Sequence, residues 1–493
     1  MSTDFIVVTP HDAVEFNDVY RNYTASAGYL VCNNIYNRVV LTEWYNPHSF
    51  PDLATHWECL DKARRWRFHL NQSARWQDGT PLTAHDVMYT HLHAKEMNYT
   101  GGGFLIDVDD IRVVNDHTVD YILHQPNSGF LTLLGNFIFT HVLPRHLYEG
   151  TDWATNPHNI RPVGSGPFRL VDWAPGEEIV LEAVKNHWGP QPEIDRLILK
   201  IVPDLDECVR LVARGDAHFF PQDTLTYDRL HLLDGATDVE LLAHPGPGMA
   251  LLDFNYTQPL WREKRVRDAV AHAINRDEFL SITDPGVSQP WDHYLLASVD
   301  WAFNPDAHAP AHDAAAAVSL LDAAGLTPDA DGVRLRLSMF FMETFHGHAA
   351  LSRIVADQLL RVGIEVEVAG LSSIDWSDRI RQEHDFDLII VGGSMTPDPE
   401  ITSTKYSSTG WNNMAGHRNP DADAAYLAAR TATDLPERGL HYKRLQEVWA
   451  RDTELVPLLW YGTYFARPTS FFGWADQLDY SVPWWHWGRI RAV

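Results

Sequence analysis

Residues 66–88, WRFHLNQSARWQDGTPLTAHDVM, are the most informative stretch of this chain. The aromatic-rich start WRFHL indicates a strand. Asp78-Gly79 indicates a tight turn, because Asp bonds its own backbone and Gly accepts a positive φ. Thr83 stands three residues before Asp86, a capping-box-like spacing with the shorter acid in place of Glu or Gln. The residues by themselves therefore predict a strand, a turn and a helix that begins at Ala84.

The hydrophobic periodicity on either side predicts a mixed α/β chain. In the first half we expect strands at 4–10, across much of 30–70 (with LVCNNIYNRVVL among the best runs), at 111–114, at 118–123 and three times within 163–204, and helices at 84–97 and 205–214. In the second half we expect a strand at 250–257 and helices within 262–282 and at 314–324. Strands and helices then alternate from 333 to 393, which indicates an α/β lobe with a partly parallel sheet.

The bulk composition excludes several classes of protein. A chain of 493 residues is too long for one hydrophobic core, so two or three lobes are expected. The formal net charge of -27 argues against nucleic acid as a partner, since neutralising phosphates requires clustered Lys and Arg. No apolar run reaches the roughly 18 residues of a spanning helix. The three cysteines show no CxxC spacing and are expected to be buried thiols.

Residues 76–87, WQDGTPLTAHDV, resemble the W-x-DGTP-x-TA-x-DV signature of family 5 of the ABC-importer solute-binding proteins, the oligopeptide-, dipeptide- and nickel-binding family. Residues 163–204 resemble the family's VGTGPY block and the strand ending in IPD. Val266–Ala269 and Ala273–Arg276 resemble its VRQA and AI-x-R blocks, with Asp268 in place of Gln. The resemblance covers nearly the whole chain.

The resemblance implies an α/β fold of the periplasmic-binding-protein-like type II (cluster C), with two α/β lobes, a hinge and an extra inserted lobe. Lobe I would comprise residues 1–41, 165–255 and 471–493, lobe II the insertion 42–164, and lobe III residues 256–470. Hinge crossings would lie near Asn255–Thr257 and Phe471–Trp474. The implied mechanism is closure of the lobes around a bound solute.

The family frame also implies a set of ligand-binding residues. These are Tyr23, Asn255, Trp291, Phe345, Ser394, Met395, Asp398 and Trp411. Peptide binders of the family carry an Asp three residues before a (D/E)P pair, where it meets the peptide ammonium. Here that position is Met395, and a buried ammonium without a partner is costly. We therefore expect an unusual solute, with Asp398 either substituting for the acid or capping its own turn.

The expected function is capture of a peptide-like or other small polar solute for a membrane ABC permease, by a monomer without a cofactor. The alternatives are a cytoplasmic enzyme of hydrolase or lyase type on the same fold, and a ligand-sensing module that contacts another protein. G-x-S-x-G, H-E-x-x-H and Walker sequences are absent, so no catalytic residue is assigned. A convergent acid/base set of Glu343, His346 and Asp398 stays open.

Location and metal binding are less constrained by the residues. MSTDFIVVTP lacks the pattern of a signal peptide, so the protein is periplasmic or on the cell surface if a signal was trimmed, and cytoplasmic otherwise. His91 and His93 would point apart on a helix, which makes them a poor metal pair. His346 and His348 stand near a strand-to-helix turn, but we assign no metal site.

Overall fold

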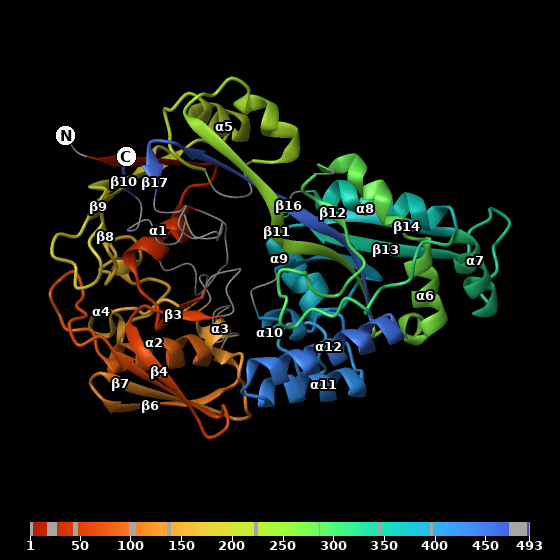
Figure 1. The fold of residues 1–493 in the computed structure, drawn as a ribbon, viewed down its shortest axis with the longest axis horizontal. Coiled ribbons are helices and arrows are strands. Elements are labelled where there is room, and N and C mark those ends of the chain that lie inside the picture. The colour runs from red at the N-terminus through yellow and green to blue at the C-terminus, as the bar shows by residue number, and fades with distance from the viewer. Residues whose placement is uncertain are drawn as a thin grey trace. The chain divides into compact units, whose positions relative to one another are not determined.

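The computed structural model describes residues 3–16, 27–42, 48–97, 105–135, 140–220, 225–284, 286–343, 345, 347–394, 398–472 and 491–492. The chain forms two compact units. Unit 1 contains residues 1–242 and 464–493, and unit 2 contains residues 243–463. The chain passes between them inside two long neighbouring strands, β11 (Val239–Phe254) and β16 (Leu455–Pro468) (Figure 1). The three-lobe boundaries stay a prediction.

Unit 1 contains two four-stranded sheets. The first has the order β1-β10-β9-β8, with β1 parallel to β10 and the remaining pairs antiparallel. The second has the order β4-β5-β7-β6 and is antiparallel throughout. The strands of the two sheets are β1 (Asp4–Thr9), β8 (Phe168–Ala174), β9 (Glu178–Ala183), β10 (Arg196–Ile201), β4 (Ala54–Leu60), β5 (Arg65–Leu70), β6 (Val108–Asn115) and β7 (Thr118–Leu123). The remaining elements are α1 (Ala27–Ile35), β2 (Val40–Thr42), β3 (Ser49–Pro51), α2 (Ala84–Glu96), α3 (Phe130–Leu134), α4 (Arg145–Tyr148), α5 (Leu205–Ala213), β17 (Phe471–Phe472) and β18 (Arg491–Ala492).

Residues 66–88 form the predicted strand, turn and helix. Gly79 has φ +91°, and Asp78 accepts a hydrogen bond from the Thr80 amide at 2.9 Å. The Thr83 hydroxyl accepts from the His85 amide, and the Asp86 carboxylate accepts from the Thr83 amide at 2.8 Å. Asp therefore closes the capping box although its side chain is shorter than that of Glu.

The strand expected within LVCNNI is wrong, because these residues belong to helix α1. Almost every described side chain of α1 is buried, including Leu30, Val31, Asn34 and Ile35. A helix buried on all sides shows no polar face, so its apolar run cannot be distinguished from a strand by periodicity. Tertiary packing therefore decides this element.

Unit 2 is built on one six-stranded sheet of order β12-β16-β11-β15-β13-β14. β13 (Leu335–Met342) runs parallel to both β14 (Ile364–Leu371) and β15 (Leu388–Ser394), which confirms the partly parallel sheet. The other elements are α6 (Lys264–Ala273), β12 (Gln289–Pro290), α7 (Ala314–Ala323), α8 (His348–Leu360), α9 (Ser373–Asp375), a π-helix (Trp376–Gln382), α10 (Glu400–Ser403), α11 (Pro420–Thr431) and α12 (Leu435–Asp452).

Two apolar cores lie on the two faces of this sheet. Along β15, Leu388 and Ile390 join the core that includes residues of α6, α7 and α8. Ile389 and Val391 join the core that includes residues of α11 and α12. Successive side chains of a strand point to opposite faces, so β15 is buried on both sides and reads as a continuous apolar run.

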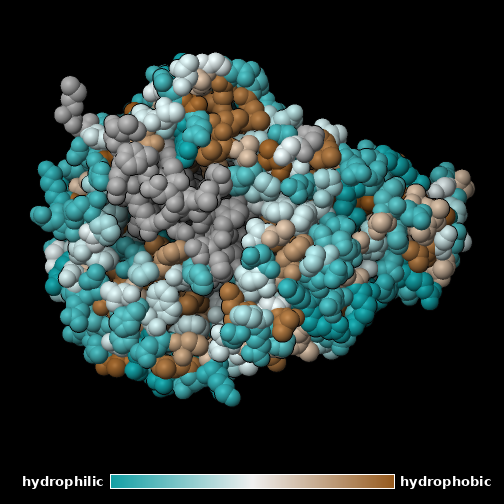
Figure 2. Space-filling model, viewed as in Figure 1, coloured by the Kyte–Doolittle hydropathy of each residue, from teal (hydrophilic) through white to brown (hydrophobic). Residues whose placement is uncertain are grey.

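Cysteine burial, helix hydrophobicity and the polarity of the surface complete the description. Cys32 and Cys208 are buried, as expected, but Cys59 is exposed, because the outer positions of β4 face solvent. Among the described residues, no helix is long and apolar enough to span a bilayer. In the view of Figure 2, the surface over unit 2 is mostly hydrophilic with scattered apolar residues, which agrees with the acidic composition.

Candidate functional site

The carboxyl ends of three parallel strands meet at one edge of the unit 2 sheet. Met342 pairs with Leu371 at the ends of β13 and β14, and β15 ends beside them at Ser394. In open α/β sheets, ligands bind outside the carboxyl ends of the strands, where loops can meet them without disturbing the ladder. This edge is therefore the candidate binding edge of unit 2.

An exposed aromatic ring stands at this edge. Phe345 lies between the end of β13 and the start of α8 and is 46% exposed. Its ring stacks on the buried His348 imidazole, with centroids 5.1 Å apart, and His348 in turn stacks toward Tyr461 at 6.0 Å. A Cβ added to Gly392 of β15 would touch the Phe345 ring at 3.5 Å. The exposed Phe345 ring, which is supported by the His348 imidazole, is called the aromatic platform.

A partly buried cation lies next to the platform. Lys405 Nζ donates to the main-chain oxygen of Gly392 at 2.7 Å. Burial and, to a smaller extent, the Arg381 charge lower the pKa of Lys405 to about 8, while Asp253 opposes the shift. Burial, with a smaller effect of Lys405, lowers the pKa of His348 to about 4, so this imidazole is neutral. We name Phe345, His348, Gly392, Lys405 and Tyr461 the strand-end cluster.

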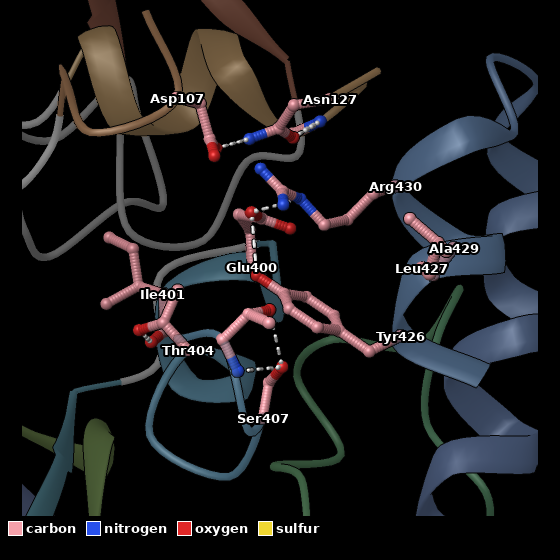
Figure 3. A network of polar contacts seen from close by, with 12 residues as sticks. Asp107, Asn127, Glu400, Ile401, Thr404, Ser407, Tyr426, Leu427, Ala429 and Arg430 are labelled. Carbon is pink, nitrogen blue, oxygen red and sulfur yellow. Dashed lines mark hydrogen bonds and ion pairs between the residues drawn. The ribbon is translucent and has the colours of Figure 1, made fainter. Parts of the chain in front are cut away.

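The segment that carries Lys405 is fixed by buried polar contacts (Figure 3). Glu400 accepts hydrogen bonds from the Tyr426 hydroxyl at 2.9 Å and the Tyr442 hydroxyl at 3.3 Å. Arg430 pairs with the same carboxylate at 3.1 Å. These partners come from α11 and α12, so the helix pair holds α10 and Lys405, just after it, against the sheet.

Asp398, predicted to touch the solute, belongs to the same set of contacts. It is 4% exposed, and its two oxygens accept from the Arg438 guanidinium at 2.7 and 3.0 Å. One oxygen also accepts from the Glu400 amide at 3.0 Å, which is the turn-capping role considered from the sequence. Its carboxylate is therefore engaged by protein partners.

Asn255 lies at the opposite edge of the sheet. Phe254 pairs with Leu388 at the start of β15, and seven strand residues span about 20 Å to Ser394. The Asn255 amide donates to the oxygens of His384 and Phe386, and its own oxygen accepts from the Thr257 amide and hydroxyl. The structure does not bring Asn255 together with Phe345.

This opposite edge has its own charged cluster and a pocket. His417 is fully buried, with Nε2 2.9 Å from Asp253 and Nδ1 3.1 Å from Glu454. Burial alone would lower the pKa of His417, but the two carboxylates raise it to about 9. A pocket of about 560 Å³ lies beside this triad, and its lining includes Tyr256, Arg262, Arg267, Arg418, Asn419 and Glu454.

The remaining sequence-predicted residues have different surroundings. Trp291 is 8% exposed, and its indole N–H donates to the Leu295 oxygen at 3.1 Å while the ring packs edge-on against Trp460. Trp411 is half-buried in the loop after α10. Ser394 ends β15 at the candidate binding edge. Tyr23 and Met395 lie outside the described residues, and all eight assignments remain predictions.

The structure describes His91, His93 and His348 but not His346, which bears on the two predicted histidine pairs and on the acid/base set. His91 is buried against the Tyr121 hydroxyl at 2.6 Å, whereas the His93 ring packs on Trp153, so the two point apart as expected. His346 lies outside the described residues, which leaves its pairing with His348, and the acid/base set of Glu343, His346 and Asp398, as predictions.

Sequence inspection missed Lys405. The lysine stands alone in the polar run ITSTKYSSTG, and nothing local indicates that its ammonium meets β15. The only available signal is its position shortly after a buried strand that ends in GGS, where loops of an α/β sheet carry ligand contacts.

Comparison with known proteins identifies the family of this chain. Residues 50–413 match the model of the bacterial extracellular solute-binding proteins, family 5 (middle region). The chain belongs to this family. Its fold is therefore the periplasmic-binding-protein-like type implied by the sequence.

Individual relatives extend the similarity over the whole chain. The oligopeptide-binding protein AppA of Bacillus subtilis is 24% identical over 95% of this chain and 88% of its own length. The structure of a putative peptide binding protein AppA from Clostridium difficile matches with a TM-score of 0.84 and 21% identity over 100% of both chains. NikZ from Campylobacter jejuni, solved with Ni(L-His), matches with a TM-score of 0.81 and 20% identity over 99% of both. At these identities the structural likeness establishes the fold.

Proposed function

We propose that this chain captures a peptide-like or other small polar solute for an ABC importer and that the strand-end cluster is its contact surface in unit 2. The observation that carries the proposal is the exposed Phe345 ring beside the Lys405–Gly392 contact, at the carboxyl ends of parallel strands. An aromatic platform supplies contact area at little entropic cost, and strand-end loops supply polar groups.

Closure of the units around the solute is the proposed mechanism. The chain crosses between the units inside β11 and β16, so a change of backbone angles at two places is enough to move one unit against the other. The solute favours the closed state only by the difference between its affinities for the two states.

The solute class follows from the charges at the edge. Peptide-binding relatives include AppA, and the family's usual acid is replaced by Met395. Glu343 is exposed at the end of β13, and its side chain lies against Gly370 of β14. We propose that Glu343 receives the positive end of a zwitterionic solute and that Lys405 faces a neutral or negative part of it.

The proposed setting is outside the cytoplasmic membrane. The family is described as extracellular, and a binding protein must meet its solute before the importer does. We propose a monomer that hands the solute to a membrane permease. The alternatives of an enzyme and of a sensing module have no additional support among the described contacts.

Native mass spectrometry of the purified protein tests the proposal. The expected result is a one-to-one complex whose bound mass is lost on denaturation and identifies a small polar solute. Titration of the emptied protein with peptides of two to nine residues, followed by Trp fluorescence, should then show saturable binding. Glu343→Gln should weaken binding of a peptide with a free N-terminus and leave its N-acetylated form unaffected. Conversion of the solute into a product by the purified protein would favour the enzyme instead.

A further inference from the structure

Three side chains of metal-ligating type lie close together in unit 2, in a segment of the chain separate from the strand-end cluster. Asp292, His293 and His308 lie in the irregular connection between β12 and α7. Each offers one ligand atom, and these atoms all lie within 4.8 Å of one another. None of the three belongs to the strand-end cluster or to the sequence-predicted ligand-binding residues.

Their spacing is close to that of ligands on one ion. His293 Nε2 lies 3.6 Å from Asp292 Oδ1, and His308 Nδ1 lies 3.0 Å from Asp292 Oδ2. Two ligand atoms each about 2.1 Å from a tetrahedral or octahedral ion are separated by about 3.0–3.4 Å. The two His–Asp separations lie within a few tenths of an ångström of this range, and all three donor atoms lie within 4.8 Å of one another, so rotation of the side chains would bring the three donors onto one ion.

The backbone holds the two histidines opposite each other. His293 and His308 form an isolated antiparallel bridge, and the Ala309 amide donates to the main-chain oxygen of Asp292 at 2.8 Å. The Trp291 amide donates to Leu458 of β16, which ties this segment to the sheet. The donor set is thus positioned by main-chain contacts on both sides.

The His293 ring has the outer contact typical of a metal ligand. Its Nδ1 lies 3.3 Å from the Ala307 main-chain oxygen. Donation of the Nδ1 proton there leaves the Nε2 lone pair free to coordinate, which is the usual arrangement of metal-bound histidine. Trp291 and Phe303 pack on the same ring, at 5.1 and 4.9 Å between centroids, and fix its orientation.

The nearby cation Arg276 forms no hydrogen bond with these three side chains in the described contacts. Arg276 interacts electrostatically with Asp292, but its guanidinium donates to the main-chain oxygens of Pro457 and Pro310. It therefore reduces the negative potential at Asp292 without bonding the carboxylate in the contacts described. Two imidazoles and one carboxylate suit late first-row divalent ions better than Mg²⁺ or Ca²⁺.

We propose that Asp292, His293 and His308 form a binding site for a late first-row divalent ion such as Zn²⁺ or Ni²⁺, with water completing the coordination. The ion would be resident and would link residues 292–293 to residues 307–309. This site is independent of the proposed solute contact, so either can fail without the other.

Isothermal titration of the EDTA-stripped protein with ZnCl₂ tests the site. The expected result is one equivalent of tight binding in the wild type and its loss in His293→Ala/His308→Ala. Asp292→Asn should weaken that equivalent by at least about tenfold. Mg²⁺ should not compete. A thermal midpoint that rises with Zn²⁺ in the wild type, but not in the double variant, would support the same conclusion.

His56→Ala/His69→Ala is the matched control. These two rings stack at 4.2 Å, and His69 pairs with Glu58 at 2.8 Å, but the three do not form a converging donor set. The control should keep the tight equivalent. Absence of that equivalent from the wild type, its retention in the correctly folded His293/His308 variant, or its loss in the control would each overturn the proposal.

Discussion

The Lys405 ammonium donates to the main-chain oxygen of Gly392 over 2.7 Å, which joins the segment after α10 to the candidate binding edge of β15. The contact places a cation where burial disfavours its charge. It therefore has consequences both for the solute and for the pH dependence of stability.

Lys405→Met should change how stability depends on pH. The pKa of Lys405 is lowered to about 8 in the folded protein, whereas an unfolded lysine titrates near 10.4. Between these values the unfolded chain binds the proton and the folded chain does not, so rising pH stabilises the wild type. The difference in unfolding free energy, wild type minus Lys405→Met, should rise from pH 7.5 to pH 10 in urea titrations. The exposed Lys185→Met should show no such rise, and a flat difference for Lys405 would contradict the assignment.

His417→Gln should destabilise the protein most at low pH. Asp253 and Glu454 raise the pKa of His417 to about 9, so its stabilising charge is fully present below about pH 6.5 and is lost as pH rises through 9. Removing the charge leaves two buried carboxylates, at a cost of about 3–5 kcal/mol. Urea midpoints at pH 6, 7.5 and 9.5 measure the effect, which should shrink at the highest pH. The exposed His231→Gln serves as the control; an effect that grows with pH would reverse the argument.

Phe345→Ala should weaken binding of the solute identified by mass spectrometry. The ring is exposed and stacked on His348, and an aromatic contact of this kind contributes about 0.5–1.5 kcal/mol, or up to about tenfold in affinity. Ile374→Ala, at another exposed apolar position of unit 2 (74% exposed), should leave affinity unchanged. Equal affinities for all three proteins would move the solute away from the strand-end cluster.

Asp398→Ala should act through stability. It leaves the Arg438 guanidinium buried without its bidentate partner, which costs about 3–5 kcal/mol. Asp398→Leu/Arg438→Met should recover part of that loss, because an apolar pair replaces the ion pair. Asp421→Ala removes an exposed pair with Arg451 and should cost no more than about 1 kcal/mol.

Solute titration of the Asp398 variants separates the two roles considered for this residue. If Asp398 only holds the segment after β15, the stable Asp398→Leu/Arg438→Met variant should bind the solute almost as the wild type does. A stable double variant that no longer binds would restore a direct contact between Asp398 and the solute.

Local chemistry made several elements predictable. Asp78-Gly79 and the Thr83–Asp86 capping box need only near neighbours along the chain, and both formed as expected. The alternation of strands and helices from 333 to 393 predicted the partly parallel sheet, because the periods of 2 and 3.6 residues are local properties. The same argument failed at α1, whose burial on every side removes the polar face that marks a helix.

The family, the α/β class and the strand-to-helix turns could be predicted from the residues alone. The tertiary structure determines which side chains meet. It placed Asn255 and Ser394 at opposite edges of a sheet, engaged Asp398 with Arg438, and brought Lys405 to Gly392 and Asp292 to His308. Turn and helix signals act over a few residues, whereas these pairings depend on sheet order and on helix packing, which no single stretch of sequence encodes.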